Sequence, residues 1–205
     1  GARPLLHMIT DGRDTPPRSA LDYLPEVERR VHATGGAIAS VMGRYFAMDR
    51  DKRWERTELA WRALVLGKGQ HAQCAQTAIR SAYTAGDSDE FIRPILLPTA
   101  VTLQPDDPLL FFNFRKDRPR QLVGALGAPD FTGFDRGPAA LARITCMMPY
   151  DRSLNLPFAF APEQPAATLG QVVSTLGLAQ FHCAETEKYA HVTYFFNGGR
   201  SVTYS

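Results

Sequence analysis

The chain has 205 residues, of which 44% are hydrophobic, and 23 basic residues against 21 acidic ones give a formal net charge of +2. This length and composition suit one well-packed core, or one domain together with part of another. A net charge so near zero argues against a general nucleic-acid binder. No apolar run approaches the roughly 20 residues that a membrane span needs.

The cysteines also narrow the class of protein. There are three of them, odd in number and far apart in the sequence: Cys74, Cys146 and Cys183. Without a Cys-x-x-Cys pair they support neither a disulfide framework nor a zinc ribbon. Reduced thiols in a cytoplasmic protein are the simplest interpretation, and we expect neither a nucleic-acid nor a membrane partner.

Apolar runs bounded by turn residues alternate with segments whose apolar residues recur at helical spacing. In chain order they predict a strand over 5–9, a helix over 21–31, a strand over 37–41, helices over 53–66 and 70–85, strands over 92–97 and 109–114, a helix over 117–126, a strand over 143–148, a helix over 169–176, and a strand pair around Phe181 and 191–197. Because strands alternate with helices, the predicted fold class is α/β, with a mostly parallel sheet flanked by helices and a partial second α/β domain at the C-terminal end.

A proline-rich segment predicts a domain junction late in the chain. Four prolines fall within residues 149–167, at Pro149, Pro157, Pro162 and Pro165. A stretch of this kind without regular periodicity is typical of a linker. We therefore predict one domain over residues 1–160, followed over residues 161–205 by a linker and a fragment of a second domain. Strand-like segments lie close to both ends, so we expect the chain to be a piece of a longer protein.

The most informative stretch is the charged run that follows the predicted strand over 37–41. Residues 43–54 contain four basic side chains and only two acidic ones, namely Arg44, Arg50, Lys52, Arg53, Asp49 and Asp51. The loop after a buried strand is where an α/β protein presents its ligand-binding residues. Arginine offers a rigid planar fork of donors that matches a carboxylate or a phosphate. The run therefore predicts a site for a small, multiply charged anion.

Two further charged clusters, residues 11–14 and 114–118, also follow predicted strands. The carboxyl ends of parallel strands meet at one crevice of an open sheet. We therefore expect five arginines around one ligand, namely Arg13, Arg44, Arg50, Arg115 and Arg118. Asp14 would be the nearby carboxylate that holds a hydroxyl group or moves its proton. Each cluster taken singly also fits a solvated surface, with Asp117 in the first turn of a helix.

Four longer segments resemble one known family, the cofactor-independent (2,3-bisphosphoglycerate-independent) phosphoglycerate mutases. In the order that the family has, they are His7–Pro17, Gly43–Trp54, Phe111–Arg118 and Ala184–Gly199. The resemblance covers nearly the whole chain but only the middle of the family's protein. It implies that residues 1–160 are most of an inserted phosphotransferase domain, without its first portion. The residues after them would return into a domain that resembles alkaline phosphatase.

The resemblance also implies a reaction and residue roles. The family interconverts 3-phosphoglycerate and 2-phosphoglycerate through a phosphoserine intermediate, and the glycerate stays bound meanwhile. By resemblance, the residues that bind the substrate are Arg13, Asp14, Arg44, Arg50, Arg115, Arg118 and Lys188. Asp14 and Lys188 are expected to be catalytic, with Lys188 as a cation that offsets developing negative charge.

The same resemblance implies two Mn²⁺ ions in the full-length enzyme and no requirement for 2,3-bisphosphoglycerate. The family's phosphorylated serine and metal ligands fall outside this chain, so no metal ligand is predicted within it. We expect the piece alone to have no mutase activity and the full-length enzyme to be a monomer. Two other interpretations stay open: a related metal-dependent phosphatase or phosphopentomutase, and a non-catalytic module that binds anions or RNA.

Overall fold

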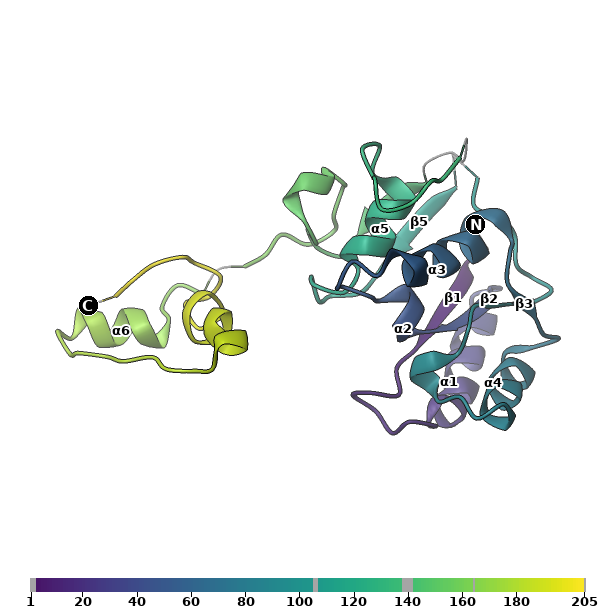
Figure 1. Ribbon diagram of the computed structural model, residues 1–205, viewed down its shortest axis with the longest axis horizontal. Coiled ribbons are helices and arrows are strands. Elements are labelled where there is room, and N and C mark those ends of the chain that lie inside the picture. The colour runs from purple at the N-terminus through teal and green to yellow at the C-terminus, as the bar shows by residue number, and fades with distance from the viewer. Residues whose placement is uncertain (1–2, 105–106, 138–141, 164, 205) are drawn as a thin grey trace. The chain divides into compact units, whose positions relative to one another are not determined.

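The computed structural model describes residues 3–104, 107–137, 142–163 and 165–204 (Figure 1). The chain divides into two compact units, unit 1 over Gly1–Phe160 and unit 2 over Ala161–Ser205. This division falls inside the segment 149–167 that the prolines mark. Which domain of a longer protein each unit belongs to stays a prediction.

Unit 1 is built on a four-stranded sheet with the strand order β1-β2-β4-β3. Its strands are β1, Leu5–Thr10, β2, Ala37–Gly43, β3, Gln70–His71, and β4, Ile95–Leu96. The pairs β1–β2 and β3–β4 are parallel, whereas β2 and β4 pair antiparallel. The predicted α/β class with a mostly parallel sheet is therefore confirmed.

Two elements of this sheet differ from the prediction. The strand predicted over 92–97 is only the two-residue β4, because Pro94 has no N–H to donate to a neighbouring strand. The helix predicted over 70–85 begins later, as α4, Ala75–Thr84. The residues before it form β3, since the N–H of Gln70 donates to the carbonyl of Pro94 at 3.0 Å and so extends the sheet.

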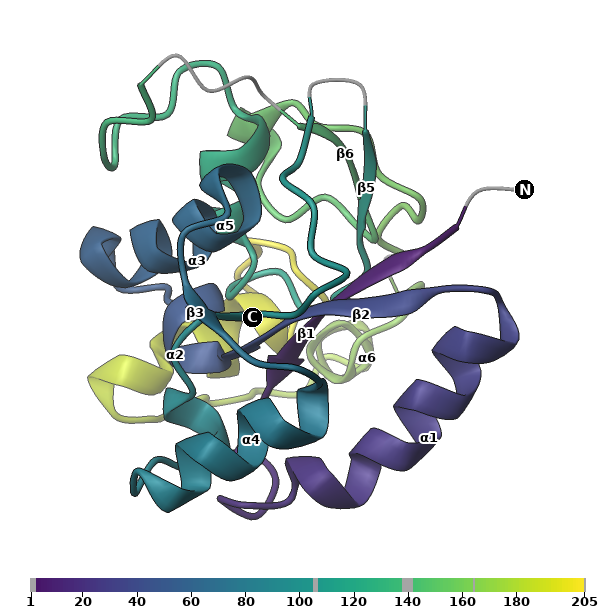
Figure 2. The same cartoon turned by 90° about the vertical axis from the view of Figure 1, so that its right-hand side faces the viewer.

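Helices cover both faces of the sheet, and each face has its own hydrophobic core (Figure 2). On one face lie α1, Ala20–Ala33, and α4, and on the other lie α3, Trp54–Leu66, and α5, Arg120–Gly127. The central strand β2 is buried along its whole length. Successive side chains of a strand point to opposite faces, so Val41 packs into the core under α1 and α4, and Met42 into the core under α3 and α5.

A second, two-stranded parallel sheet adds to the core under α3 and α5. Its strands are β5, Pro108–Phe111, and β6, Arg143–Cys146. The strand predicted over 109–114 stops at Phe111 because its partner strand β6 ends at Cys146, the residue opposite. The helix predicted over 117–126 begins only at Arg120, as α5. A loop between β5 and α5 therefore carries two of the predicted site arginines.

Short helical segments connect these elements within the described part of unit 1. They are α2, Arg44–Ala47, η1, Asp89–Phe91, and η2, Arg152–Leu154. Of these, η1 lies directly against the ends of β1 and β2. The hydroxyl of Thr10 donates to the carbonyl of Asp89 at 2.7 Å, and the N–H of Gly43 donates to the carbonyl of Ile92 at 2.7 Å. These bonds fix the points from which the loop after β1 and the helix α2 begin.

In the part of unit 2 that the structure describes, the regular elements are short helical segments joined by irregular chain. These segments are α6, Leu169–Thr175, the 3-10 segment η3, Thr186–Lys188, and the π-helical segment η4, His191–Phe195. The helix predicted over 169–176 is thus confirmed.

The strand pair predicted around Phe181 and over 191–197 is wrong. β-branched and aromatic residues favour a strand only where a neighbouring strand offers backbone partners, and the described residues of unit 2 include no strand. The N–H of Phe196 donates instead to the carbonyl of His191 at 3.1 Å, so the segment satisfies its backbone locally.

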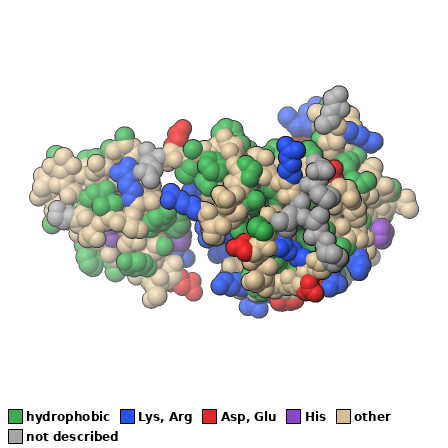
Figure 3. All heavy atoms as spheres, turned by 90° about the horizontal axis from the view of Figure 1, so that it is seen from above, with side chains coloured by type: hydrophobic (Ala, Val, Ile, Leu, Met, Phe, Trp, Pro, Cys, Tyr) green, Lys and Arg blue, Asp and Glu red, His purple; other side chains and the backbone are tan. Residues whose placement is uncertain are grey.

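The surface shows two features that bear on partners. In the described ranges, no helix combines the length and the apolar character that crossing a bilayer requires. On the face that Figure 3 shows, basic side chains form several separate groups, with hydrophobic and neutral surface between them.

The close contact between β2 and η1 predicts that Gly43→Ala destabilises unit 1. A Cβ atom at this position would lie 2.2 Å from the backbone oxygen of Glu90, which cannot move without shifting η1. We expect the free energy of unfolding to fall by about 2 kcal/mol. Urea denaturation followed by the fluorescence of Trp54 and Trp61, both in α3, measures this change.

The matched control is Gly124→Ala in α5, where the nearest atom to an added Cβ is Leu154 Cδ2 at 3.4 Å. Alanine in a helix is favoured over glycine by roughly 0.5–1 kcal/mol, so this variant should be at least as stable as the unmodified chain. An unchanged stability of Gly43→Ala would contradict the proposed contact.

Candidate anion-binding site

One end of unit 1 contains a cavity of about 190 Å³. The end of β1, the start of α2 and the loop between β5 and α5 supply its walls. Most of the lining residues are polar or charged: Ile9, Thr10, Asp11, Asp14, Arg44, Met48, Asn113, Arg115 and Arg118. A cavity of this size and lining suits a small polar ligand, because drug-sized apolar ligands occupy larger, hydrophobic pockets.

Arg44 is the most buried of the arginines at this cavity, with 7% of its side chain exposed. It is the first residue of α2, directly after β2. Its Nη1 donates to Oδ1 of Asp11 and, at 2.8 Å, to Oδ2 of Asp14. Among the described residues, its Nε has no hydrogen-bond partner. A buried donor without an acceptor is costly, so an acceptor on a bound ligand would stabilise this site.

The contact with Arg44 keeps both aspartates ionised. The hydrogen bond from Arg44 lowers the pKa of Asp14 below its ordinary value. Partial burial raises the pKa of Asp11, but the hydrogen bonds from Arg44 and from the N–H groups of Asp14 and Arg13 outweigh it, so the net shift is downward. At neutral pH, Asp14 is therefore a hydrogen-bond acceptor rather than a proton donor.

Asp11 also shapes the loop that carries two predicted site residues. Its Oδ1 accepts the N–H groups of Arg13 and Asp14, both at 3.2 Å. Gly12 adopts a left-handed φ of 67°, which glycine allows at little cost, and a Cβ there would lie 2.7 Å from the backbone nitrogen of Glu90. The turn therefore requires both residues, Asp11 as acceptor and Gly12 for its conformation.

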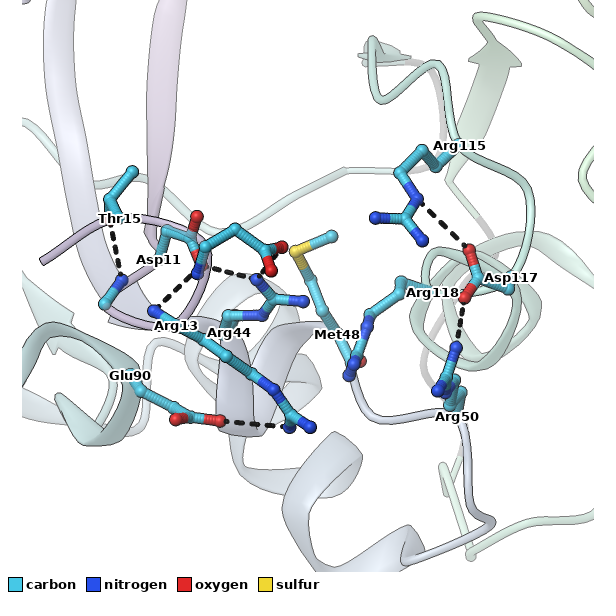
Figure 4. A network of polar contacts seen from close by, with 12 residues as sticks. Asp11, Arg13, Thr15, Arg44, Met48, Arg50, Glu90, Arg115, Asp117 and Arg118 are labelled. Atoms are coloured by element: carbon cyan, nitrogen blue, oxygen red, sulfur yellow. Dashed lines mark hydrogen bonds and ion pairs between the residues drawn. The ribbon is translucent and has the colours of Figure 1, made fainter. Parts of the chain in front are cut away.

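Arg118 lies between the other arginines (Figure 4). Its Nη1 donates to the carbonyl of Met48 at 3.2 Å. Burial, and then the like charges of Arg44, Arg50 and Arg13, lower the pKa of Arg118 from its ordinary value. When neighbouring cations lower the pKa of an arginine, that arginine lies in a positive local potential. Such a potential attracts an anion.

Three more arginines flank this centre, and each is paired with a carboxylate. Oδ2 of Asp117 accepts Nη1 of Arg50 at 2.5 Å, and its Oδ1 lies 3.8 Å from Nε of Arg115. Nη1 of Arg13 lies 3.7 Å from Oε1 of Glu90. Roughly half of each of these arginine side chains is exposed, so these ion pairs are weak. Their guanidinium groups can re-pair with a ligand at little cost.

The structure brings together six of the seven predicted site residues: Arg13, Asp14, Arg44, Arg50, Arg115 and Arg118. The seventh, Lys188, belongs to unit 2, where its Nζ lies 3.6 Å from Oε1 of Glu185 and its side chain is half exposed. The roles of all seven in binding and catalysis stay predictions.

The sequence predicts only one of the four carboxylates at this site, Asp14. Asp11, Asp117 and Glu90 are site residues that were not predicted. Asp11 and Asp117 stand inside the predicted charged clusters, and that position was an available signal. Glu90 comes from η1, far along the chain from Arg13, and nothing in the sequence indicates their contact. Together, four carboxylates and five arginines leave an excess of positive charge.

The residues of the described ranges include no group of three or more His, Cys, Asp or Glu side chains that could hold a metal ion. The carboxylates at the cavity are instead paired with arginines. The site therefore fits an anion and not a metal cation, and no chemistry is assigned to a metal at this position.

Fold and site together define an α/β protein with a small cavity lined by arginine and aspartate side chains. Residues 2–152 match a protein-family model described as "BPG-independent PGAM N-terminus". A phosphoglycerate mutase of Leishmania mexicana, solved by crystallography at low cobalt concentration, has a similar structure with a TM-score of 0.74 and 36% sequence identity, over 98% of this chain and 40% of that one. The chain therefore belongs to the family of 2,3-bisphosphoglycerate-independent phosphoglycerate mutases.

Curated relatives agree with this assignment. A 2,3-bisphosphoglycerate-independent phosphoglycerate mutase of Myxococcus xanthus is 50% identical over 100% of this chain and 41% of its own length. The enzyme of the same name from Lawsonia intracellularis is 49% identical over 98% of this chain and 40% of its own length. The chain thus spans about two fifths of the length of these relatives. The predicted family is confirmed.

The contacts of Arg44 predict that Arg44→Gln raises the pKa of Asp14. The loss of the cationic hydrogen-bond donor removes the main cause of the downward shift, so the carboxyl should titrate closer to its ordinary range. An NMR titration of the side-chain carboxyl carbon measures this pKa. Arg44 stabilises ionised Asp14 only in the folded chain. The contribution of Asp14 to stability should therefore be present at pH values above the pKa that Asp14 has in the unfolded chain, and it should be lost as the pH falls through the lower pKa that Asp14 has in the folded chain.

A control on α1 separates this effect from a general change of charge. Hydrogen bonds from Arg29 and Arg30 lower the pKa of Glu26 to about 2. Arg29→Gln should therefore raise the pKa of Glu26 and leave Asp14 unchanged. If Arg44→Gln leaves the titration of Asp14 where it was, the described pairing is incorrect.

Proposed function

We propose that this chain is the substrate-binding part of a glycolytic 2,3-bisphosphoglycerate-independent phosphoglycerate mutase, and that its arginine-lined cavity binds phosphoglycerate. One observation carries the proposal: in a chain of this family, three arginines line a cavity of about 190 Å³ and two more, Arg13 and Arg50, lie close enough to Arg118 to lower its pKa. The relatives' name supplies the substrate and the reaction.

Phosphoglycerate is a three-carbon acid with a carboxylate and a phosphate, and each can accept two parallel hydrogen bonds from a guanidinium. Arg44, Arg115 and Arg118 line the cavity, so they are the first arginines that the ligand meets. Arg118 gains from the added negative charge, because three of its neighbours are cations. The half-exposed Arg13, Arg50 and Arg115 then exchange their carboxylate partners for the ligand.

Holding the glycerate is the part of the proposed reaction that these residues perform. The phosphoryl group of 3-phosphoglycerate passes to a serine outside this chain and returns to the other oxygen, giving 2-phosphoglycerate. Glycerate must stay bound and reorient between the two transfers, and arginines on its carboxylate keep it in place. Asp14, held ionised by Arg44, accepts a hydrogen bond from a glycerate hydroxyl. Lys188 offsets negative charge at the phosphoryl group.

The proposed full-length enzyme uses two Mn²⁺ ions, whose ligands lie outside this chain, and needs no 2,3-bisphosphoglycerate. When bound, the metal ions would supply activation of the serine and charge neutralisation at the phosphoryl group, while this chain would contribute substrate binding and the positive charge of Lys188. We further propose that the full-length enzyme is a monomer in the cytoplasm, with phosphoglycerate as its small-molecule partner and with neither nucleic acid nor membrane as partners.

Isothermal titration calorimetry with 3-phosphoglycerate tests the binding role. Arg118→Gln removes a charge-assisted donor from the cavity, and we expect the dissociation constant to rise about 10- to 100-fold. Arg62→Gln is the matched control, because Arg62 pairs with Glu58 on the outer side of α3 and should not contact the ligand. Equal losses in both variants, or displacement of the ligand by single-stranded RNA, would refute the proposal.

A coupled assay with 3-phosphoglycerate and Mn²⁺ tests the proposed division of labour. The purified chain should bind the substrate but produce no 2-phosphoglycerate, because the proposed nucleophile and metal ligands lie elsewhere. Measurable turnover that rises in proportion to the concentration of the chain would show that it contains a complete active site.

A further inference from the structure

Arg50 and Arg118 come from two different segments of unit 1, and a buried polar contact joins these segments behind the cavity. Arg50 is in the loop over 49–53, between α2 and α3, and Arg118 precedes α5. Two residues make the contact. Asp49 directly precedes Arg50 in the loop, and Gln121 lies three residues after Arg118. Neither lines the cavity.

Asp49 organises the loop from inside. Only 3% of its side chain is exposed. Its Oδ2 accepts the N–H groups of Asp51 at 3.1 Å and Arg53 at 3.0 Å, together with Nε2 of Gln121 at 2.8 Å. Three donors thus converge on one buried oxygen. The loop keeps this shape even though Lys52 has a left-handed φ of 58°, which costs energy in a residue with a side chain.

Gln121 makes this contact from the side of α5, as both an acceptor and a donor. Its Oε1 accepts the N–H of Lys52 at 2.7 Å, while its Nε2 donates to Asp49 and, at 3.0 Å, to Oγ1 of Thr57. One buried amide therefore bonds both to the strained residue of the loop and to its internal acceptor. Because Gln121 is in α5, any movement of the loop relative to that helix must break buried hydrogen bonds.

This connection acts against a repulsion. Arg50 is one of the cations that lower the pKa of Arg118, so in the absence of a ligand the two guanidinium groups favour separation. The exposed ion pair between Arg50 and Asp117 opposes this weakly. The hydrogen bonds between Asp49, Gln121 and the loop backbone also oppose this separation, and because they are buried, water does not weaken them as it weakens the exposed ion pair.

We infer that Asp49 and Gln121 are positioning residues, which hold Arg50 and Arg118 at the spacing that one small anion bridges. This inference rests on the proposed function, since it names what orders the proposed phosphoglycerate site. Preorganisation of this kind raises affinity because the ligand does not have to order the two segments itself.

The sign of the effect distinguishes positioning from simple electrostatics. Asp49 carries a negative charge near an anion site. If only Coulomb interaction mattered, removing this charge should tighten anion binding. If Asp49 holds the loop, its removal should weaken binding instead. Gln121 is uncharged, so replacing it with leucine changes the bonding without changing the charge.

The test measures 3-phosphoglycerate affinity by calorimetry in three variants of the chain. We expect Asp49→Ala and Gln121→Leu to raise the dissociation constant about 5- to 30-fold. Asp49→Asn keeps an oxygen that can accept the two loop N–H groups and Gln121, and it loses only the long 3.4 Å ion pair between Oδ1 and Arg56, so it should stay within about 3-fold of the unmodified chain. This pattern of loss and rescue would support the inference.

Ile79→Val controls for general destabilisation, because Ile79 is fully buried in the other core, under α1 and α4. It should lower the melting temperature while leaving the affinity unchanged. The inference is overturned if Asp49→Ala and Gln121→Leu bind normally, if Asp49→Ala binds more tightly, or if Ile79→Val weakens binding to the same extent.

Amide hydrogen exchange provides a readout that does not depend on the ligand. In Gln121→Leu, the N–H groups of Asp51 and Arg53 keep their direct acceptor on Asp49, so only a loosened loop would expose them. We expect their exchange to accelerate at least 10-fold. If the unmodified chain does not bind 3-phosphoglycerate, the proposed function fails, and this exchange alone decides the inference: acceleration supports it and unchanged protection overturns it.

Discussion

Repulsion between Arg118 and the guanidinium groups of Arg44, Arg50 and Arg13 is the constraint on which this end of unit 1 depends. Arg118 shows it most directly, because burial and three neighbouring arginines lower its pKa. Four carboxylates offset part of the repulsion. A bound anion would offset more of it, which is the physical basis of the proposed anion site.

The carboxylates differ in how firmly they hold their partners. Asp11 and Asp14 fix the buried Arg44, which thereby keeps its direction whether or not a ligand is present. Glu90 and Asp117 pair with arginines that are about half exposed, so those arginines are available to a ligand. One side of the site is thus fixed by buried contacts, and the other is held by half-exposed ion pairs that can rearrange.

The sequence predicted part of this site because Arg13 and Arg44 follow β1 and β2, neighbouring parallel strands whose ends meet. Arg115 and Arg118 follow β5, which belongs to the second sheet and not to the single sheet that the prediction assumed. Periodicity indicated β1, β2 and most helices of unit 1, and the clusters beside them contained Arg13, Arg44 and Arg118. Contacts that join distant segments could not be predicted in this way. Glu90 reaches Arg13 from η1, and Gln121 reaches the loop at Asp49 from α5, and neither residue carries a local signal.

Errors arose where the structure depends on neighbouring strands. The aromatic and β-branched run over 191–197 reads as a strand, yet it is helical where no strand lies beside it in unit 2. The strand predicted over 109–114 ends at Phe111 because β6 ends opposite it. Strand propensity indicates only that a segment can fit into a sheet. Whether a neighbouring strand is present to pair with it depends on the tertiary structure.

A crystal structure of the chain with 3-phosphoglycerate would test the central claim most directly, because it locates the ligand relative to the arginines. The account predicts a single ligand in the cavity, with its acidic oxygens within hydrogen-bond distance of Arg44, Arg118 and at least one of the flanking arginines. A ligand bound elsewhere, or one that contacts only a single arginine of the five, would contradict it.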